Sequence, residues 1–249
     1  MASQDSASKA WKIFVGVLVG LLLILLIAEF GLRWYMGRQM TSQFMETTQA
    51  EGLEVKEKPS VSFGASPLTL GMLGGKISQM NMSTPSTLQI EGTDVKGQPA
   101  ADIELRDLSL ASAPVAGQMR ATTTLPDDFL LATFQKSIAE QSGNATLVNM
   151  VITSITTNAE DNTIDVEFGG GLASLALEPS ANNGVLDIAT RKAAVFGMNL
   201  PDQATAALSD SLREGVQEQF VGSRLHVDAV EVGSGELKLT VAGTNVPLK

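Results

Sequence analysis

Few residues of this chain are suited to acid–base chemistry, and those few are poorly grouped. Its 249 residues include one histidine and no cysteine. His226 alternates with Leu225 and Val227, a spacing typical of a residue on one face of a strand. The acidic pairs Asp127-Asp128 and Glu160-Asp161 fall where a helix start and a turn are expected, and acids stabilise a helix N-terminus. We therefore predict no catalytic residues and no enzyme activity.

Composition argues against other kinds of site as well. A metal site needs several clustered histidine, cysteine or acidic ligands, so we predict no metal and no cofactor. The net charge of −10 should repel nucleic acid. Both tryptophans and the single tyrosine lie at or before residue 35, so the rest of the chain lacks these rings for stacking sugars.

One apolar run determines where the chain is expected to work. Ile13 to Ala28 contains no charge, and a helix needs about 20 mostly apolar residues to cross a bilayer. Reading from Trp11 to Tyr35 reaches that length, with aromatic rings at both ends. The alternative is a cleaved signal peptide, but Ala28 and Gly31 make a poor cleavage site. We expect an uncleaved transmembrane anchor over residues 11–35.

The segments on either side of the anchor set its expected orientation. The flanking positive charges nearly balance, but residues 1–10 form only a short tail and everything foldable follows residue 35. We expect a single-pass protein of the plasma membrane with a cytoplasmic N-terminus and its domain on the outer, periplasmic face. The lack of cysteine favours a bacterial envelope.

A stem helix is expected next, over residues 36–58. Met36, Met40 and Phe44 recur at i+4 spacing and form one face of a helix that continues to about Glu51. This face either packs on the domain or lies against lipid. The extracytoplasmic domain is expected over residues 59–249.

Strand patterns dominate this domain and are interrupted by two amphipathic helices. The first is expected from Pro126 to Gly143 and the second from Pro201 to Gly222. Alternation with a period of two slips in phase at Asp107, which predicts a bulge. We predict an α+β fold in which strongly curved antiparallel sheets form a half-barrel around the two helices. The many methionines fill such a core or, alternatively, adapt to a ligand.

The segment Pro59–Ile77 resembles a signature of the LmeA-like lipid-binding proteins of actinobacterial cell envelopes. The matching positions are Gly64, Pro67, Leu68, Leu73, Gly75 and Lys76. The closing segment Gly235–Leu248, with its Gly-Thr-x-Val-Pro-Leu ending, is also similar. Ser66 and Leu68 replace aromatic residues that often flank the turn proline, and Met72 replaces a leucine. In layout the chain is most similar to membrane-anchored, LmcA-type members.

This resemblance implies a tubular lipid-binding-like fold and a non-catalytic protein that supports lipoglycan assembly or transport, with lipomannan and lipoarabinomannan as the glycans. The implied partners are a phospholipid or a lipid-anchored mannose glycan, together with envelope glycosyltransferases. We predict that acyl chains contact apolar residues of both helices and of the first strands: Leu130, Phe134, Ile138, Leu208, Leu212, Val216, Phe220, Phe63, Leu73, Met80 and Met82. Lys76 is expected near the head group. The alternative is a scaffolding module that recruits glycosyltransferases without binding lipid.

Overall fold

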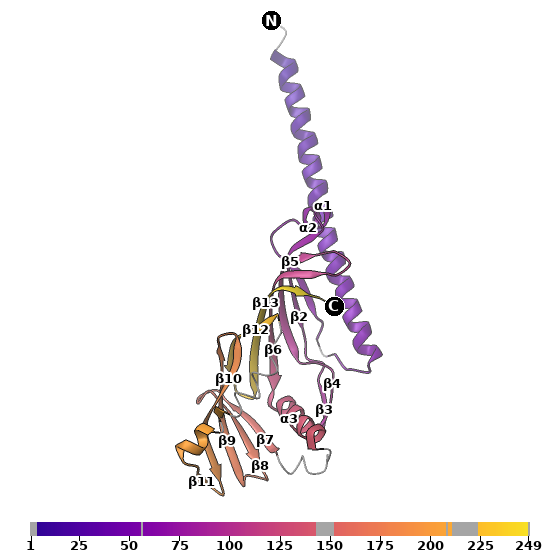
Figure 1. Ribbon diagram of the computed structural model, residues 1–249. Helices are drawn as coiled ribbons and strands as arrows, with labels where there is room; N and C mark the ends of the chain where they lie inside the picture. Colours follow the sequence, from indigo (N-terminus) through magenta and orange to yellow (C-terminus); the bar gives the residue numbers. More distant parts are fainter. Residues whose placement is uncertain (1–3, 56, 143–151, 208, 211–223, 249) are drawn as a thin grey trace.

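The computed structural model describes residues 4–55, 57–142, 152–207, 209–210 and 224–248 (Figure 1). It is an α+β structure with helices α1 (Gln4–Ala50), α2 (Leu68–Leu73) and α3 (Asp127–Ser142). All described strand pairs are antiparallel. The strands are β1 (Ser60–Phe63), β2 (Lys76–Thr84), β3 (Gln89–Glu91), β4 (Asp94–Lys96), β5 (Ala100–Ser109), β6 (Val115–Pro126), β7 (Ile152–Asn158), β8 (Thr163–Phe168), β9 (Ala173–Asn182), β10 (Val185–Val195), β11 (Met198–Asn199), β12 (Leu225–Val232) and β13 (Glu236–Pro247).

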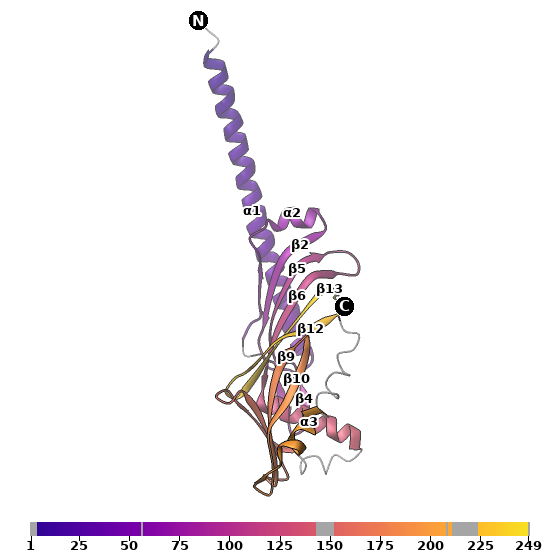
Figure 2. The same ribbon diagram turned by 60° about the vertical axis from the view of Figure 1, so that its left-hand side comes forward.

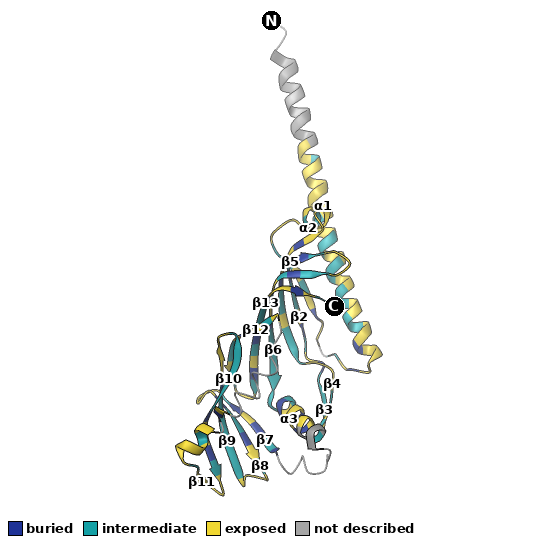
Figure 3. Ribbon diagram, viewed as in Figure 1, coloured by how far each residue is buried: buried dark blue, intermediate teal, exposed yellow. Residues whose placement is uncertain are grey.

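Helix α1 is continuous, with an exposed apolar part followed by a packed part. Residues 21–28 are all exposed, and Figure 3 shows this part standing clear of the sheets. From Glu29 onward, one side of α1 is half-buried every three or four residues, and Met36 and Met40 pack against the domain. The stem helix therefore packs on the domain, as the first of the two alternatives predicts. It ends at Ala50, close to the end expected at about Glu51, and Gly52 then adopts a φ of 71°.

The larger sheet, sheet A, has the strand order β1-β2-β5-β6-β13-β12 and lies nearest to α1 and α2. The phase slip predicted in β5 is present. Asp107 has a φ of 51°, and both Leu105 and Leu108 are buried although they are three positions apart on the strand. A hairpin turn joins β12 and β13, with the Gly233 N–H donating to the Glu236 carbonyl.

The second sheet, sheet C, has the order β11-β10-β9-β8-β7 and lies at the end of the molecule far from the N-terminus (Figure 1). Its strands β9 and β10 contact β12, which joins the two sheets. Helix α3 contacts β7, β6 and the small β3–β4 hairpin, and Figure 2 shows it on one side of the molecule. Pro126 ends β6 rather than starting α3, because it pairs with Glu236 in the ladder.

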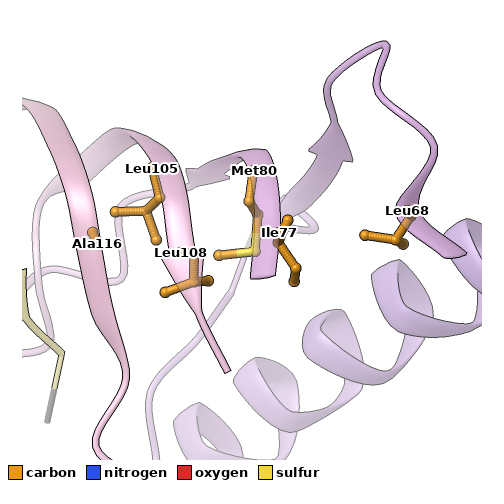
Figure 4. Close-up of a cluster of buried hydrophobic side chains, with 6 residues drawn as sticks. All are labelled: Leu68, Ile77, Met80, Leu105, Leu108 and Ala116. Atoms are coloured by element: carbon orange, nitrogen blue, oxygen red, sulfur yellow. The ribbon is translucent and has the colours of Figure 1, made fainter. Parts of the chain in front are cut away.

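Two hydrophobic clusters form the core. The proximal cluster, near α1, consists of Leu68, Ile77, Met80, Leu105, Leu108 and Ala116, whose side chains gather between α2 and strands β2, β5 and β6 (Figure 4). The distal cluster, near α3, consists of Leu130, Ile152, Ile155, Val166 and Leu237. Each cluster is extended by half-buried apolar neighbours.

The predicted half-barrel is wrong in its curvature. Neither large sheet of the described chain closes or curls strongly, and a two-sheet arrangement takes its place. Among the described elements, α3 contacts sheet C mainly along β7, and the distal cluster joins it to Leu237 of β13. The helix therefore lies at one edge of the sheet, and the sheet does not wrap around it. Of the second predicted helix, residues 202–207 and 209–210 are helical, and its remaining part lies outside the described residues.

Candidate lipid-binding site

An apolar cavity lies at the distal cluster, between α3, sheet C and the neighbouring ends of β6 and β13. Its volume is about 330 Å³, near the lower end of the range for small-molecule sites. Every residue that lines it is apolar: Leu125, Leu130, Phe134, Ile152, Ile155, Ile164, Val166, Phe168, Leu175, Leu177, Pro179, Leu186, Ile188, Leu237 and Leu239. Such a lining selects for hydrocarbon.

The strands of sheet C supply most of this lining through simple alternation. Successive side chains of a strand point to opposite faces. In β8, Ile164, Val166 and Phe168 face the cavity, while Asp165 and Glu167 line an open polar groove. The same alternation in β9 and β10 continues the apolar surface. Sheet C therefore has one apolar and one polar face.

Two polar contacts hold α3 against β7. The Asp127 carboxylate accepts hydrogen bonds from the Thr157 hydroxyl at 2.8 Å and from the Thr157 N–H at 3.1 Å. At the other end of β7, the buried Gln135 amide donates to the Ile152 carbonyl at 2.7 Å. These contacts position Leu130 and Phe134 over the cavity. Leu130 is buried, whereas Phe134 is 49% exposed and lies at the rim.

The apolar lining of the cavity has an energetic consequence. The lining offers no hydrogen-bonding partner to water, so water filling this space is poorly held. An apolar ligand would instead bury the exposed apolar walls, which is favourable in proportion to the area removed from water.

The structure brings only some of the predicted lipid contacts to this cavity. Leu130 and Phe134 line it. The side chain of Ile138 is not described, and four further predicted contacts lie outside the described residues: Leu208, Leu212, Val216 and Phe220.

The predicted contacts from the first strands lie elsewhere, at the proximal cluster. Met80 is buried in that cluster and Phe63 packs against it, while Met82 is half-buried on the same strand as Met80. Leu73 is 86% exposed on α2. These residues do not line the cavity, because β1 contacts α1 and β2 contacts α2, whereas α3 contacts β3, β4, β6 and β7.

Lys76 is also distant from the cavity. The adjacent Ile77 is level with Leu108 and Ala116 across sheet A. Leu125 follows Ala116 by nine residues on β6, or about 30 Å at about 3.3 Å per residue. The head group of a lipid in the cavity would therefore need other partners, and the predicted role of Lys76 stays a prediction.

The histidine and the acidic pairs that were considered for catalysis lie at the strand, helix-start and turn positions expected for them. His226 is exposed on β12. Asp127 and Asp128 begin α3, and the N–H groups of Glu160 and Asp161 donate to the Asn158 side chain in a turn. Among the described residues, no cluster of histidine and acidic side chains is suited to hold a metal.

Sequence reasoning did not single out several of the residues that build the cavity. Three strands carry most of the missed lining, including Ile164 in β8, Leu177 in β9 and Ile188 in β10. Their alternation was visible, but it does not distinguish a filled core from a hollow one. The position of Gln135 depends on a contact with β7 that no local pattern encodes.

Comparison with known proteins agrees with this geometry. The model of the LmeA-like phospholipid-binding family matches residues 27–242, which include the cavity and most of the chain. No curated protein and no solved structure matches the chain. The match spans well over half of the sequence, and so the chain belongs to the LmeA-like phospholipid-binding family.

Proposed function

We propose that this chain is a non-catalytic, membrane-anchored envelope protein that holds the acyl part of a phospholipid, or of a lipid-anchored mannose glycan, in the distal cavity. The observation that carries the proposal is the wholly apolar lining of a 330 Å³ cavity in a member of a phospholipid-binding family. Each buried methylene is worth about 0.8 kcal/mol, so even part of one acyl chain would bind usefully.

The anchor forms the second part of the proposal. Helix α1 is long and apolar enough to cross a membrane, and a signal sequence would pass the same test. An anchor is favoured because α1 continues without interruption from its exposed apolar part into the part that packs on sheet A. The domain would then face the periplasm and support lipoglycan assembly or transport, in contact with envelope glycosyltransferases.

Lipid content of the purified protein tests the cavity. Leu177 is half-buried and lines the cavity, so Leu177→Trp should fill part of it and reduce co-purifying phospholipid, measured by extraction and mass spectrometry. Filling existing space should change the melting temperature little. The matched control is Leu172→Trp, because Leu172 is 54% exposed near the start of the same strand. It should retain the lipid.

Two results would contradict the proposal. If the wild-type chain carries no lipid and exchanges none with vesicles, the scaffolding alternative is favoured. If Leu177→Trp lowers the melting temperature sharply while the folded fraction keeps its lipid, the lipid lies outside this cavity.

A further inference from the structure

A second apolar surface lies at the other end of the molecule, on the short helix α2. Leu68 is 3% exposed and points into the proximal cluster, whereas Leu70 and Leu73 are 63% and 86% exposed. The chain that follows α2 folds back closely against the helix, because a Cβ on Gly71, within α2, would lie only 2.6 Å from the Lys76 carbonyl oxygen. Helix α2 therefore presents two leucines away from the domain, and no described element covers them.

The position of α2 along α1 is fixed by a polar clamp, which we define as Glu29 and Arg33. The Glu29 carboxylate accepts hydrogen bonds from the Leu68 N–H at 2.6 Å and from the Thr69 N–H and hydroxyl at 2.9 Å. It also pairs with Arg33 at 2.6 Å, and Arg33 donates to the carbonyls of Phe63 and Ser66. The clamp sets the start of α2 level with Glu29.

That level coincides with the end of the exposed apolar part of α1. A bilayer core about 30 Å thick takes about 20 helical residues, so a span that begins near Trp11 ends near residue 31. Trp34 and Tyr35, which are 65% and 60% exposed, then lie at the height that such rings prefer at a membrane interface. Figures 1 and 2 both show α2 beside α1 at the point where α1 meets the sheets.

We propose that α2, together with Trp34 and Tyr35, forms a membrane-contact surface whose leucines enter the outer leaflet of the bilayer that α1 crosses. The occupant is lipid, because the surface continues the exposed apolar face of α1 at the same level. Two cationic side chains suit the adjacent phosphates: Lys76 is exposed and begins β2, separated from the end of α2 by two residues, and Arg38 lies over the Trp34 ring. This inference rests on the proposed anchor and not on the cavity.

The consequence concerns orientation. A helix that crosses the bilayer leaves the domain free to tilt, whereas a second contact at α2 would hold it upright. The distal cavity would then be kept at the end of the molecule that faces away from the membrane, as the arrangement in Figure 1 indicates.

The chain contains no cysteine, so a single labelled cysteine can test this surface in the full chain. Leu73→Cys, Ile24→Cys and Phe196→Cys each replace an exposed apolar residue, on α2, on the apolar part of α1 and beside sheet C. Each variant would carry an environment-sensitive nitrobenzoxadiazole dye and be inserted into phosphatidylcholine vesicles that contain doxyl-labelled lipid. We expect blue-shifted emission and lipid quenching at residue 24, a smaller shift with clear quenching at residue 73, and neither at residue 196.

Two results would overturn the inference. If residue 24 reports lipid while residue 73 matches residue 196, α2 does not enter the leaflet although the anchor stands. If residues 24 and 73 both report water, the anchor and the membrane-contact surface fail together. Neither result bears on lipid in the distal cavity, which is measured separately by extraction.

Discussion

The proximal and distal clusters are built by the same kind of strand, yet one is filled and the other is hollow. In the proximal cluster, α1 lays Leu32, Met36 and Met40 against the buried side chains of sheet A. In the distal cluster, α3 touches sheet C mainly along β7, an edge strand of that sheet. Among the described elements, the two clusters therefore differ in how far a helix covers the sheet and not in the pattern of their strands.

Methionine is also distributed unequally between the proximal and distal clusters. Met36, Met40, Met80 and Met119 all belong to the proximal cluster or pack against it, whereas none of the residues that line the cavity is a methionine. Methionine is flexible and fills irregular gaps. Of its two alternatives, core filling is therefore the one that this arrangement favours, and the cavity keeps rigid branched and aromatic walls.

The largest expected effect is on stability, when one isoleucine side chain in each cluster is truncated to alanine. Ile77 is 2% exposed in the filled cluster, so Ile77→Ala should cost about 2–5 kcal/mol of stability. Ile164 already borders empty space, so Ile164→Ala should lose mainly the transfer term, about 1–2 kcal/mol. Thermal unfolding of the full chain in detergent measures both. Equal losses would mean that the distal cluster is packed as tightly as the proximal one.

A smaller effect is expected from the clamp that joins α1 to the proximal cluster. Glu29→Ala removes the acceptor of the Leu68 and Thr69 N–H groups, and hydrogen bonds to a charged group are worth about 1.5–3 kcal/mol. The matched control, Glu46→Ala, removes an exposed carboxylate from the same helix. We expect Glu29→Ala alone to lower the melting temperature, with the amount of bound lipid unchanged. Loss of lipid in Glu29→Ala would show that the two clusters are coupled.

The smallest effect is expected on the polar face of sheet C. The Arg191 guanidinium pairs with Glu178 and lowers the pKa of that carboxyl. A lowered folded-state pKa contributes stability above the unfolded pKa, and this stability is lost as the pH falls through the folded pKa. Arg191→Gln should therefore lower the melting temperature slightly at neutral pH, with a difference that shrinks on acidification, and should leave lipid content unchanged. A lipid defect in this variant would mean that both faces of the sheet serve binding.

Local pattern predicted much of the fold and less of the site. The helix expected from Pro126 to Gly143 closely matches the observed span of α3, and alternation identified the phase slip at Asp107. These features follow from periodicity along a few residues, which the sequence displays directly. They also placed Leu130 and Phe134 correctly against apolar strands.

The rest depended on contacts between distant segments. Ile103 and Leu105 alternate in β5 as Ile164 and Val166 do in β8, so nothing in either run reveals which one borders a cavity. The i+4 spacing of Glu29 and Arg33 is visible in the sequence, but the contacts of Glu29 with the Leu68 and Thr69 N–H groups span 39 and 40 residues and are not. Curvature was overestimated for the same reason: the joining of two sheets through β9, β10 and β12 is not encoded locally.

Photocrosslinking tests most directly whether acyl chains occupy the hollow cluster. The purified chain would be loaded with a phospholipid that carries a diazirine near the end of one acyl chain, irradiated and digested with trypsin. Cleavage after Lys136 and Arg191 yields one peptide, residues 137–191, which carries β7, β8 and β9. We predict that the label concentrates in this peptide and falls in Leu177→Trp. A label confined to residues 77–106, which carry β2 and most of β5, would contradict lipid binding in the distal cavity.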